Sequence, residues 1–285
     1  MPVRPQIAIV GPGRLGSALA WALTEAGYRV NEVISRDTRS SQKRAREIAR
    51  RTRSFTTTLK TANLDSDLIW FCVPDREIAV AARALIRSSE WKDKVAFHSS
   101  GALASDELNV LRRRGAAVAS VHPMMTFVRG SIPSLKGVAF ALEGDAKAIR
   151  LARKITRDLG GDPFSISATS KIAYHAWGGF SSPLLVAMLV TAEQVAQTAG
   201  LSSTQARKIM LPIVRKTLAN YSALGPAGAF SGPIVRGDVP IVQKHLQTLQ
   251  KIPQAKEVYV ALARAAVKYL PARNRKELKK LLAAN

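Results

Sequence analysis

The sequence lacks cysteine pairs, a leader-like segment and a long apolar run. Its single cysteine, Cys72, lies in the apolar stretch LIWFCV, which excludes an intramolecular disulfide framework and suggests a buried thiol in a reducing compartment. No apolar segment of signal-peptide length precedes the first glycines. The longest apolar run, residues 183–192, is shorter than the ~20 residues that span a bilayer. We therefore expect a cytoplasmic protein with no membrane partner.

Acidic residues are also scarce, because 43 Lys and Arg stand against 20 Asp and Glu, for a formal net charge of +23. The excess is spread along the chain, with 27 basic against 16 acidic residues up to residue 170 and 16 against 4 after it. Such a field attracts phosphates and other anions, nucleic acid included. The sequence has no aromatic-interleaved basic patch, zinc pattern or helix-turn-helix signature. An anionic ligand or a generally basic proteome explains the charge more simply than nucleic-acid binding.

Short apolar runs alternate with amphipathic stretches over residues 1–167. Strand character is found in QIAIV, YRVNEVI, DLIWFCV, KVAFHSSG, AAVASVHP, GVAFALEG and DPFSISA, and helical stretches such as RLGSALAWALTEAG separate several of them. This alternation predicts an α/β fold with a doubly wound, mostly parallel Rossmann sheet. Residues 168–285 carry helical periodicity with almost no strand signal, so we expect an all-α C-terminal domain entered through a long helix.

The motif GPGRLG directly follows the first predicted strand and opens a helix. In this context a G-x-G-x-x-G turn binds the pyrophosphate of a dinucleotide. Gly11 makes the tight turn, Gly13 lets the backbone approach the phosphates, and Gly16 allows the helix to pack closely on the strand. The helix N-terminus attracts the phosphate charge. The predicted pyrophosphate site therefore comprises Gly11, Pro12, Gly13, Arg14, Leu15 and Gly16.

The end of the second strand decides between NAD and NADP. An NAD site offers a carboxylate there to the ribose hydroxyls, whereas this chain has Ser35 and Arg36, followed by a basic helix. A hydroxyl and a guanidinium suit a 2′-phosphate. Asp37 could still serve a 2′-hydroxyl if the strand ends one residue later. NADP is therefore the preferred cofactor, with NAD as the alternative.

Three further strand ends should lie along the same edge of the sheet, where α/β proteins bind ligands. After DLIWFC, we expect Val73, Pro74 and Asp75 to run along the ribose and diphosphate, although Asp75 could simply cap a helix. The stretches HSSGAL and SVHPMMTF end the next two strands. They bring toward the expected nicotinamide position the side chains of His98, Ser99, Ser100 and His122.

The stretches VGPGRLGSALA, VPDREI, HSSGAL, SVHPMMTF, KIAYHAW and FSGPIVRGD give the chain a family resemblance. It resembles NADP-dependent oxidoreductases with a Rossmann domain and a helical C-terminal domain. That group includes pyrroline-5-carboxylate reductase, the β-hydroxyacid dehydrogenases, prephenate dehydrogenase and F420-dependent NADP reductase. The chain is most similar to a bacterial branch in which a Rossmann-like domain precedes a helical domain of unknown function. The resemblance implies hydride transfer between NADPH and a small carbonyl, imine or hydroxyacid, by a homodimer formed through the helical domain.

The same resemblance implies polarising and proton-donating side chains. The β-hydroxyacid dehydrogenases carry a lysine and, four residues on, an asparagine, and SKIAYH places Lys171 and His175 at that spacing on one helical face. Prephenate dehydrogenase carries a catalytic histidine in a His-Pro pair, to which His122 and Pro123 look similar. The catalytic candidates are His122, Lys171 and His175. The alternatives are a structural histidine and a solvated lysine.

We therefore expect an NADP-dependent oxidoreductase with a small-molecule substrate and no metal. The substrate could be anionic, because Arg236 in FSGPIVRGD could bind an anion, although it could also pair with Asp238 or with a partner subunit. A redox-silent NADP-binding sensor and a basic nucleic-acid-associated protein are the alternatives outside this class. Prephenate- or ketopantoate-type chemistry is an alternative within it.

Overall fold

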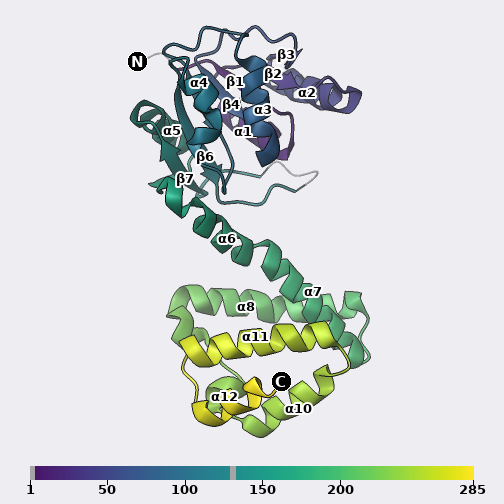
Figure 1. Ribbon diagram of the computed structural model, residues 1–285. Coiled ribbons are helices and arrows are strands. Elements are labelled where there is room, and N and C mark those ends of the chain that lie inside the picture. Colours follow the sequence, from purple (N-terminus) through teal and green to yellow (C-terminus); the bar gives the residue numbers. More distant parts are fainter. Residues whose placement is uncertain (1–3, 129–132) are drawn as a thin grey trace. The chain divides into compact units, whose positions relative to one another are not determined.

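The computed structural model describes residues 4–128 and 133–285, and the chain divides into two compact units, Met1–Gly179 and Phe180–Asn285 (Figure 1). Unit 1 includes most of helix α6 (Lys171–Ser181), on which Lys171 and Tyr174 are buried. The predicted domain division after residue 167 was drawn from the loss of strand character and stays a prediction. The compact units divide later because the first turns of α6 pack in unit 1.

An eight-stranded sheet forms the centre of unit 1, in the order β3-β2-β1-β4-β5-β6-β7-β8. All neighbouring strands are parallel except β6 and β7. The strands are β1 (Ile7–Val10), β2 (Val30–Ser35), β3 (Phe55–Thr58), β4 (Leu68–Phe71), β5 (Val95–His98), β6 (Ala117–Pro123), β7 (Ala139–Gly144) and β8 (Asp162–Ser165). The predicted doubly wound, mostly parallel α/β fold is confirmed.

The central strands β1, β4 and β5 are buried on both faces of the sheet, and successive residues of a strand point to opposite sides. In β1, Ile7 and Ile9 enter one core, while Ala8 and Val10 enter the other. The first core is closed by α1 (Arg14–Glu25), α2 (Arg39–Thr52) and α5 (Ala146–Asp158). The second is closed by α3 (Asp75–Leu85), the 3₁₀ turn η1 (Ser105–Leu108) and α4 (Asn109–Arg112).

Two local features of unit 1 differ from expectation. Strand β3 has the sequence FTTT, pairs only with β2 and leaves Phe55 70% exposed, so it carries none of the buried apolar signal that revealed the other strands. Asp75 is the first residue of α3, and the N-cap is Pro74. The Asp75 carboxylate therefore stabilises the first turn by its charge rather than by capping it.

Unit 2 is helical throughout, as predicted. Its helices are α7 (Pro183–Thr198), α8 (Ser203–Ala229), α9 (Pro233–Arg236), α10 (Val239–Leu249), α11 (Pro253–Tyr269) and α12 (Arg275–Ala283). A small core joins α10, α11 and α12 and includes Val242, Leu246, Val260 and Leu278. Helix α7 packs on α8 and α11, and α8 is kinked at Gly225, where φ is 68°.

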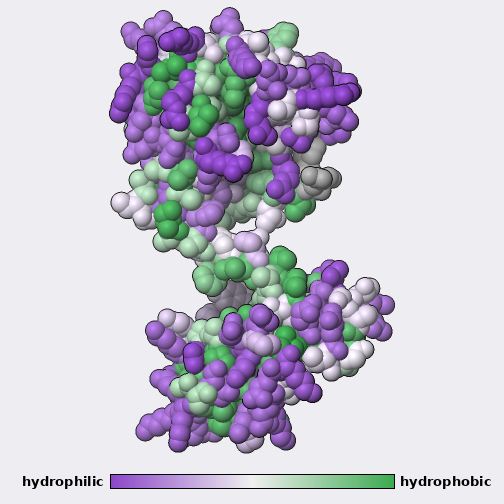
Figure 2. All heavy atoms as spheres, turned by 45° about the vertical axis from the view of Figure 1, so that its right-hand side comes forward, coloured by the Kyte–Doolittle hydropathy of each residue, from purple (hydrophilic) through white to green (hydrophobic). Residues whose placement is uncertain are grey.

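Hydrophobic side chains reach the surface of the helical unit (Figure 2). By length and composition alone, the 31-residue stretch Ala168–Thr198 is long and apolar enough to cross a membrane. An 18-residue segment of it has a mean hydropathy of 1.3, and only 6% of that segment is buried. The sequence expectation of no span considered only uninterrupted apolar runs. The helix breaks within this stretch at Ser182 before Pro183, and Lys171 near its start is buried.

Candidate active site

The turn after β1 has the backbone geometry that a dinucleotide phosphate needs. Gly11 has a φ of +103°, and a Cβ atom there would lie 2.7 Å from the carbonyl oxygen of Cys72. A Cβ atom on Gly16 would collide with the carbonyl oxygen of Gly11, so α1 packs directly on the turn. A Cβ atom on Gly13 would meet the carbonyl oxygen of Cys72 only at 3.9 Å, and no described side chain caps the first turn of α1. The N–H groups of that turn can therefore meet an anion.

A cavity of about 190 Å³ opens beside this turn, at the carboxyl ends of β1, β2 and β4. The predicted cofactor residues that line it are Gly11, Pro12, Gly13, Ser35, Arg36, Val73 and Pro74. Those that do not line it are Arg14, Leu15, Gly16, Asp75, Ser99 and Ser100. The lining also includes residues that sequence reasoning did not assign to the site, namely Val10, Ile34, Ser41, Arg44, Leu59, Cys72, Glu77, Val80 and Ala81. Of these only Arg44 had a signal, as part of the basic run after β2.

The end of β2 presents positive charge to this cavity. Arg36 and Arg44 are exposed, and within the described part of the chain neither guanidinium pairs with a carboxylate. The carboxylate of Asp37 accepts a hydrogen bond from Gln42 (3.1 Å) and lies 3.3 Å from Nζ of Lys60. Asp37 is therefore already engaged, which weakens the alternative in which it binds a 2′-hydroxyl.

The side chain of Ser35 supports the strand end itself. It is 2% exposed, and its hydroxyl lies within hydrogen-bond distance of the carbonyl oxygens of Arg36 (3.1 Å) and Thr57 (3.3 Å). A phosphate at this edge would consequently meet the Arg36 guanidinium rather than a free serine hydroxyl.

Lys171, at the start of α6, is 1% exposed and not a solvated surface charge. Its ammonium donates to Oγ of Ser120 (2.7 Å) and to the carbonyl oxygen of Ser100 (3.0 Å). Burial lowers the pKa of Lys171 to about 8, against the opposing effect of the Glu143 and Asp75 carboxylates. The ammonium thus ties α6 to β6 and to the loop after β5.

His122, near the end of β6, faces two side chains of α6. Its Nδ1 lies 2.8 Å from the hydroxyl of Tyr174, and its ring is 6.5 Å from the ring of His175 between centroids. Burial, with the charge of Lys171, lowers the pKa of His122 to about 4, and burial raises the pKa of Tyr174 to about 12. At neutral pH the imidazole is therefore uncharged and the phenol protonated.

The three predicted catalytic side chains thus come together within unit 1. The spacing of Lys171, Tyr174 and His175 places them on one face of α6, because residues three and four apart are neighbours on a helix. His175 is exposed, His122 is half-buried and Lys171 is fully buried. Tyr174 was not among the predicted residues, since an aromatic side chain at helical spacing gives the same signal as a core residue.

The loop after β5 is built around the buried side chain of His98. The backbone N–H of Ser100 donates to Nδ1 (3.1 Å), so the proton lies on Nε2, which donates to the carbonyl oxygen of Ala104 (2.9 Å). Burial lowers the pKa of His98 to about 4. This histidine was expected near the nicotinamide. It is an uncharged side chain whose two hydrogen bonds hold the loop together.

The hydroxyls of the two serines in this loop also accept hydrogen bonds from within the protein. Ser99 Oγ accepts from the indole N–H of Trp70 (2.8 Å). Ser100 Oγ accepts from the backbone N–H groups of Leu103 (2.9 Å) and Ala102 (3.2 Å). Ser100 is buried. Its hydroxyl would therefore keep these hydrogen bonds within the loop even if a ligand bound nearby.

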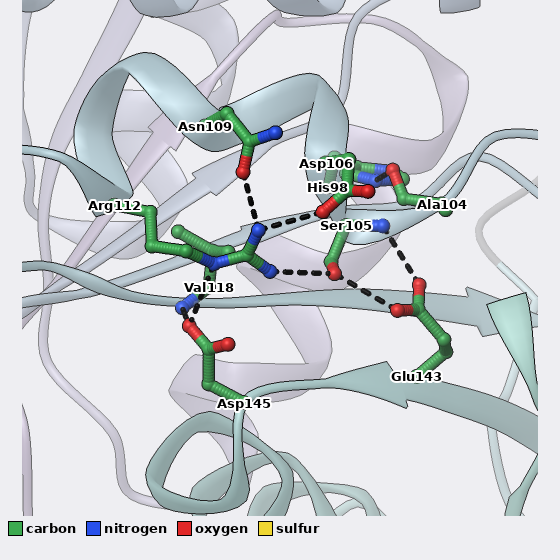
Figure 3. Close-up of polar contacts among 9 residues, drawn as sticks. All are labelled: His98, Ala104, Ser105, Asp106, Asn109, Arg112, Val118, Glu143 and Asp145. Carbon is green, nitrogen blue, oxygen red and sulfur yellow. Dashed lines mark hydrogen bonds and ion pairs between the residues drawn. The ribbon is translucent and has the colours of Figure 1, made fainter.

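A polar network fixes the segment that follows the loop (Figure 3). Ser105 donates from its backbone N–H (2.7 Å) and its hydroxyl (2.9 Å) to the carboxylate of Glu143 on β7. Arg112 donates to Ser105 Oγ (3.0 Å) and pairs with Asp106 (2.6 Å) and Asp145 (3.2 Å). The network anchors η1 to the edge of β7 and so sets where the loop ends.

Acidification should destabilise unit 1 through His98. The pKa of the folded histidine, about 4, lies below its ordinary value of 6.5, so the unfolded chain binds more protons between these pH values. The contribution to stability is complete above pH 6.5 and falls as the pH decreases toward 4, by at most about 1.4 kcal/mol per pH unit. Urea unfolding across this pH range measures the slope.

His98→Gln is the matched variant, because its amide can still donate toward Ala104 but does not titrate. It should unfold more easily at pH 7 and lose part of the wild-type slope, while the contribution of His122 remains in both proteins. Equal slopes in the two proteins would contradict the assignment of a neutral, buried His98.

Solved structures of low sequence identity share this fold. The "putative NADP oxidoreductase BF3122 from Bacteroides fragilis" matches with a TM-score of 0.76 and 23% identity, over 92% of this chain and 97% of that one. Protein TM1727 from Thermotoga maritima matches with a TM-score of 0.73 and 22% identity, over 98% of each chain. A reductive aminase from Aspergillus terreus, in complex with NADPH and ethyl-5-oxohexanoate, matches with a TM-score of 0.69 and 15% identity, over 98% of this chain and 99% of that one.

Domain families match both parts of the sequence, although no curated protein sequence matches the chain. Residues 1–123 match the Rossmann-like domain, and residues 138–266 match the domain of unknown function DUF2520. The first match covers the strands β1 to β6 and the glycine-rich turn, and the second includes Lys171, Tyr174 and His175. The chain is therefore similar to a Rossmann-like domain over its first part and to a DUF2520 domain over its second.

Proposed function

We propose that this protein is an NADP-dependent oxidoreductase that transfers hydride between NADPH and a small carbonyl, imine or hydroxyacid. One observation carries the proposal. The parallel strands β1, β4, β5 and β6 end at a single sheet edge, and that edge holds both the glycine-rich turn and the cluster of His122, Tyr174 and Lys171. A dinucleotide on the turn would extend along the same edge toward the cluster.

The residues at the turn fit NADP. The Gly11 and Gly13 backbone and the uncapped first turn of α1 would hold the pyrophosphate, and Arg36 with Arg44 would hold the 2′-phosphate. A protein of the same fold is known in complex with NADPH, which supports this choice. When bound, the cofactor supplies the hydride and the chain supplies binding, orientation and polarisation.

The three predicted catalytic side chains take different parts in this function. His122 polarises the substrate as a neutral hydrogen-bond donor, and the exposed His175 beside it is the candidate proton donor. Lys171 is a positioning residue, because its ammonium is buried and donates to Ser100 and Ser120. A cytoplasmic location accords with the buried free thiol of Cys72.

Turnover of simple ketones tests the oxidoreductase function. The full-length protein is titrated with NADPH by cofactor fluorescence and then mixed with cyclohexanone or ethyl levulinate, with and without allylamine. These are compounds bound by the Aspergillus reductive aminase, and 1-pyrroline-5-carboxylate extends the panel to a cyclic imine. Saturable NADPH binding and NADPH oxidation with at least one compound are expected.

Two other outcomes would replace this function. NADPH binding without oxidation across the panel would identify a redox-silent sensor. Salt-sensitive DNA or RNA binding that survives Gly13→Asp, with no NADPH binding, would identify a nucleic-acid-associated protein.

The preference for NADP depends on Arg36. Arg36→Ala should raise the Kd for NADPH about 10-fold to 100-fold and leave the Kd for NADH unchanged, since a charge-assisted hydrogen bond to the 2′-phosphate is lost. Arg39→Ala removes a neighbouring exposed arginine that does not line the cavity and should change neither constant. Tighter binding of NADH than of NADPH by the wild type, unaltered in Arg36→Ala, would contradict the assignment.

We also propose that unit 2 forms a homodimer through α7 and α8. Both helices carry large apolar side chains that are at least 49% exposed: Leu184, Val186, Val190, Ile209, Ile213, Leu218, Tyr221 and Leu224. Isolated exposed apolar residues are common, but so many on two adjoining helices are typical of an interaction surface. A second copy of the same apolar surface is a self-complementary partner for it.

Light scattering after gel filtration tests the dimer. The wild type should have twice the mass of the chain, and Ile209→Asp should be monomeric with unchanged helix content, because a carboxylate would be buried in the interface. Lys208→Asp, next to it and already exposed, should remain dimeric. A monomeric wild type that binds vesicles of phosphatidylcholine and phosphatidylglycerol would instead assign the apolar surface to a membrane.

A further inference from the structure

We propose that Tyr174 is a positioning residue that holds His122 in the neutral tautomer with its proton on Nε2, and that Gly101 keeps this N–H uncovered so that a substrate oxygen or nitrogen can accept it. The role toward substrate rests on the proposed reductase function. The tautomer is a property of this chain alone, so it can be tested without a substrate.

The direction of the hydrogen bond between Tyr174 and His122 follows from the surroundings of the hydroxyl. The two atoms are 2.8 Å apart, and the phenol is protonated at neutral pH. If Nδ1 carried the proton and donated to Tyr174, the phenol O–H would need another acceptor. Among the described residues, Nδ1 of His122 is the hydroxyl's hydrogen-bond partner, and Tyr174 is 7% exposed. Tyr174 therefore donates, and the neutral ring carries its proton on Nε2.

A side chain at residue 101 would cover the Nε2 edge of His122, and glycine has none. A Cβ atom on Gly101 would lie 2.9 Å from Nε2 of His122 and 2.8 Å from Cδ2 of His175. The backbone of Gly101 does not require glycine, since its φ is not positive. The requirement is steric and comes from the two imidazole rings. A methyl group at this position would cover the N–H that the proposed substrate contacts.

The charges around His122 keep the imidazole neutral. Burial and the positive charge of Lys171 disfavour a second proton on the ring, and hydrogen bonds to Ser100 and Ser120 hold Lys171 in place. The titratable groups that act on the ring are Lys171 and His175 on α6, Asp75 at the start of α3 and His98 at the end of β5. His122 acts by hydrogen bonding only and keeps its proton, because its loss would leave an imidazolate. Between pH 6 and 8 no loss of activity should therefore arise from titration of His122.

Nitrogen-15 NMR of the histidine-labelled full-length protein tests the tautomer without any substrate. The signals of His122 are identified by their loss in His122→Asn, and they should show a protonated Nε2 and an unprotonated Nδ1. In Tyr174→Phe the fixed donor is gone, so the signals should move toward a mixture of tautomers. A proton on Nδ1 in the wild type, or no change in Tyr174→Phe, would overturn the proposal.

The chain contains a matched control for this experiment. His245 and Tyr259 in unit 2 form the same kind of pair, with 3.1 Å between Nδ1 and the hydroxyl. Tyr259→Phe removes an equivalent hydrogen bond away from the cluster and should leave both the His122 signals and turnover unchanged. A shift of the His122 signals in Tyr259→Phe would show that the response is not specific to Tyr174.

Kinetics test the role toward substrate, with whichever ketone or imine the wild type reduces. Tyr174→Phe should lower kcat about tenfold while the Kd for NADPH stays constant, as expected when one neutral hydrogen bond is lost. Gly101→Ala should keep the Nε2–H tautomer and NADPH binding but lose most of kcat/KM. Unaltered kcat/KM in Gly101→Ala would overturn the role of the uncovered edge, even if Tyr174→Phe does not fold. If no compound is reduced but the tautomer is as described, the proposed reductase function fails and the positioning by Tyr174 stands.

Discussion

The buried ammonium of Lys171 is the interaction on which the candidate active site depends. A buried charge is tolerated only where hydrogen bonds replace its water, and here the acceptors are the carbonyl oxygen of Ser100 and the hydroxyl of Ser120. These atoms belong to the loop after β5 and to β6, so the start of α6 is fixed against both. Once α6 begins there, its helical period places Tyr174 beside His122, and the ammonium disfavours protonation of that histidine.

The acceptors of Lys171 are themselves held by polar contacts that reach across the sheet. The ring of His98 donates a hydrogen bond to the carbonyl oxygen of Ala104 at the other end of the loop. The next residue, Ser105, donates its backbone N–H to the carboxylate of Glu143 on β7. Glu143 also opposes, through its charge, the lowering of the Lys171 pKa. The loop, β7 and α6 are therefore coupled, because each supplies a partner that the next one needs. Such a network fixes the position of the candidate site through hydrogen bonds within the protein.

Features encoded in adjacent residues were predictable from the sequence, and features assembled from distant residues were not. The strands with buried apolar residues, the glycine-rich turn and the spacing of Lys171 and His175 are local patterns, and the fold that they predict is confirmed. Strand β3 was missed because an edge strand needs little apolar signal. Ser99 and Ser100 were recognised as residues of the right edge, but their hydroxyls are engaged by Trp70 and by the backbone of the loop. The network of Ser105, Arg112 and Glu143 joins residues that are separated in the sequence, so no short sequence motif predicts it.

Two histidine–tyrosine pairs in this chain have the same hydrogen bond but different surroundings. The same two atoms, Nδ1 and a phenol oxygen, meet in His122–Tyr174 and in His245–Tyr259, and both pairs have nearly perpendicular rings. Only the first pair has a buried ammonium nearby and a glycine against the opposite edge of the imidazole. The hydrogen bond selects a tautomer in either place, but it directs a donor toward a ligand only where that edge is uncovered. We therefore expect function at this site to depend on Gly101 as well as on the side chains around it.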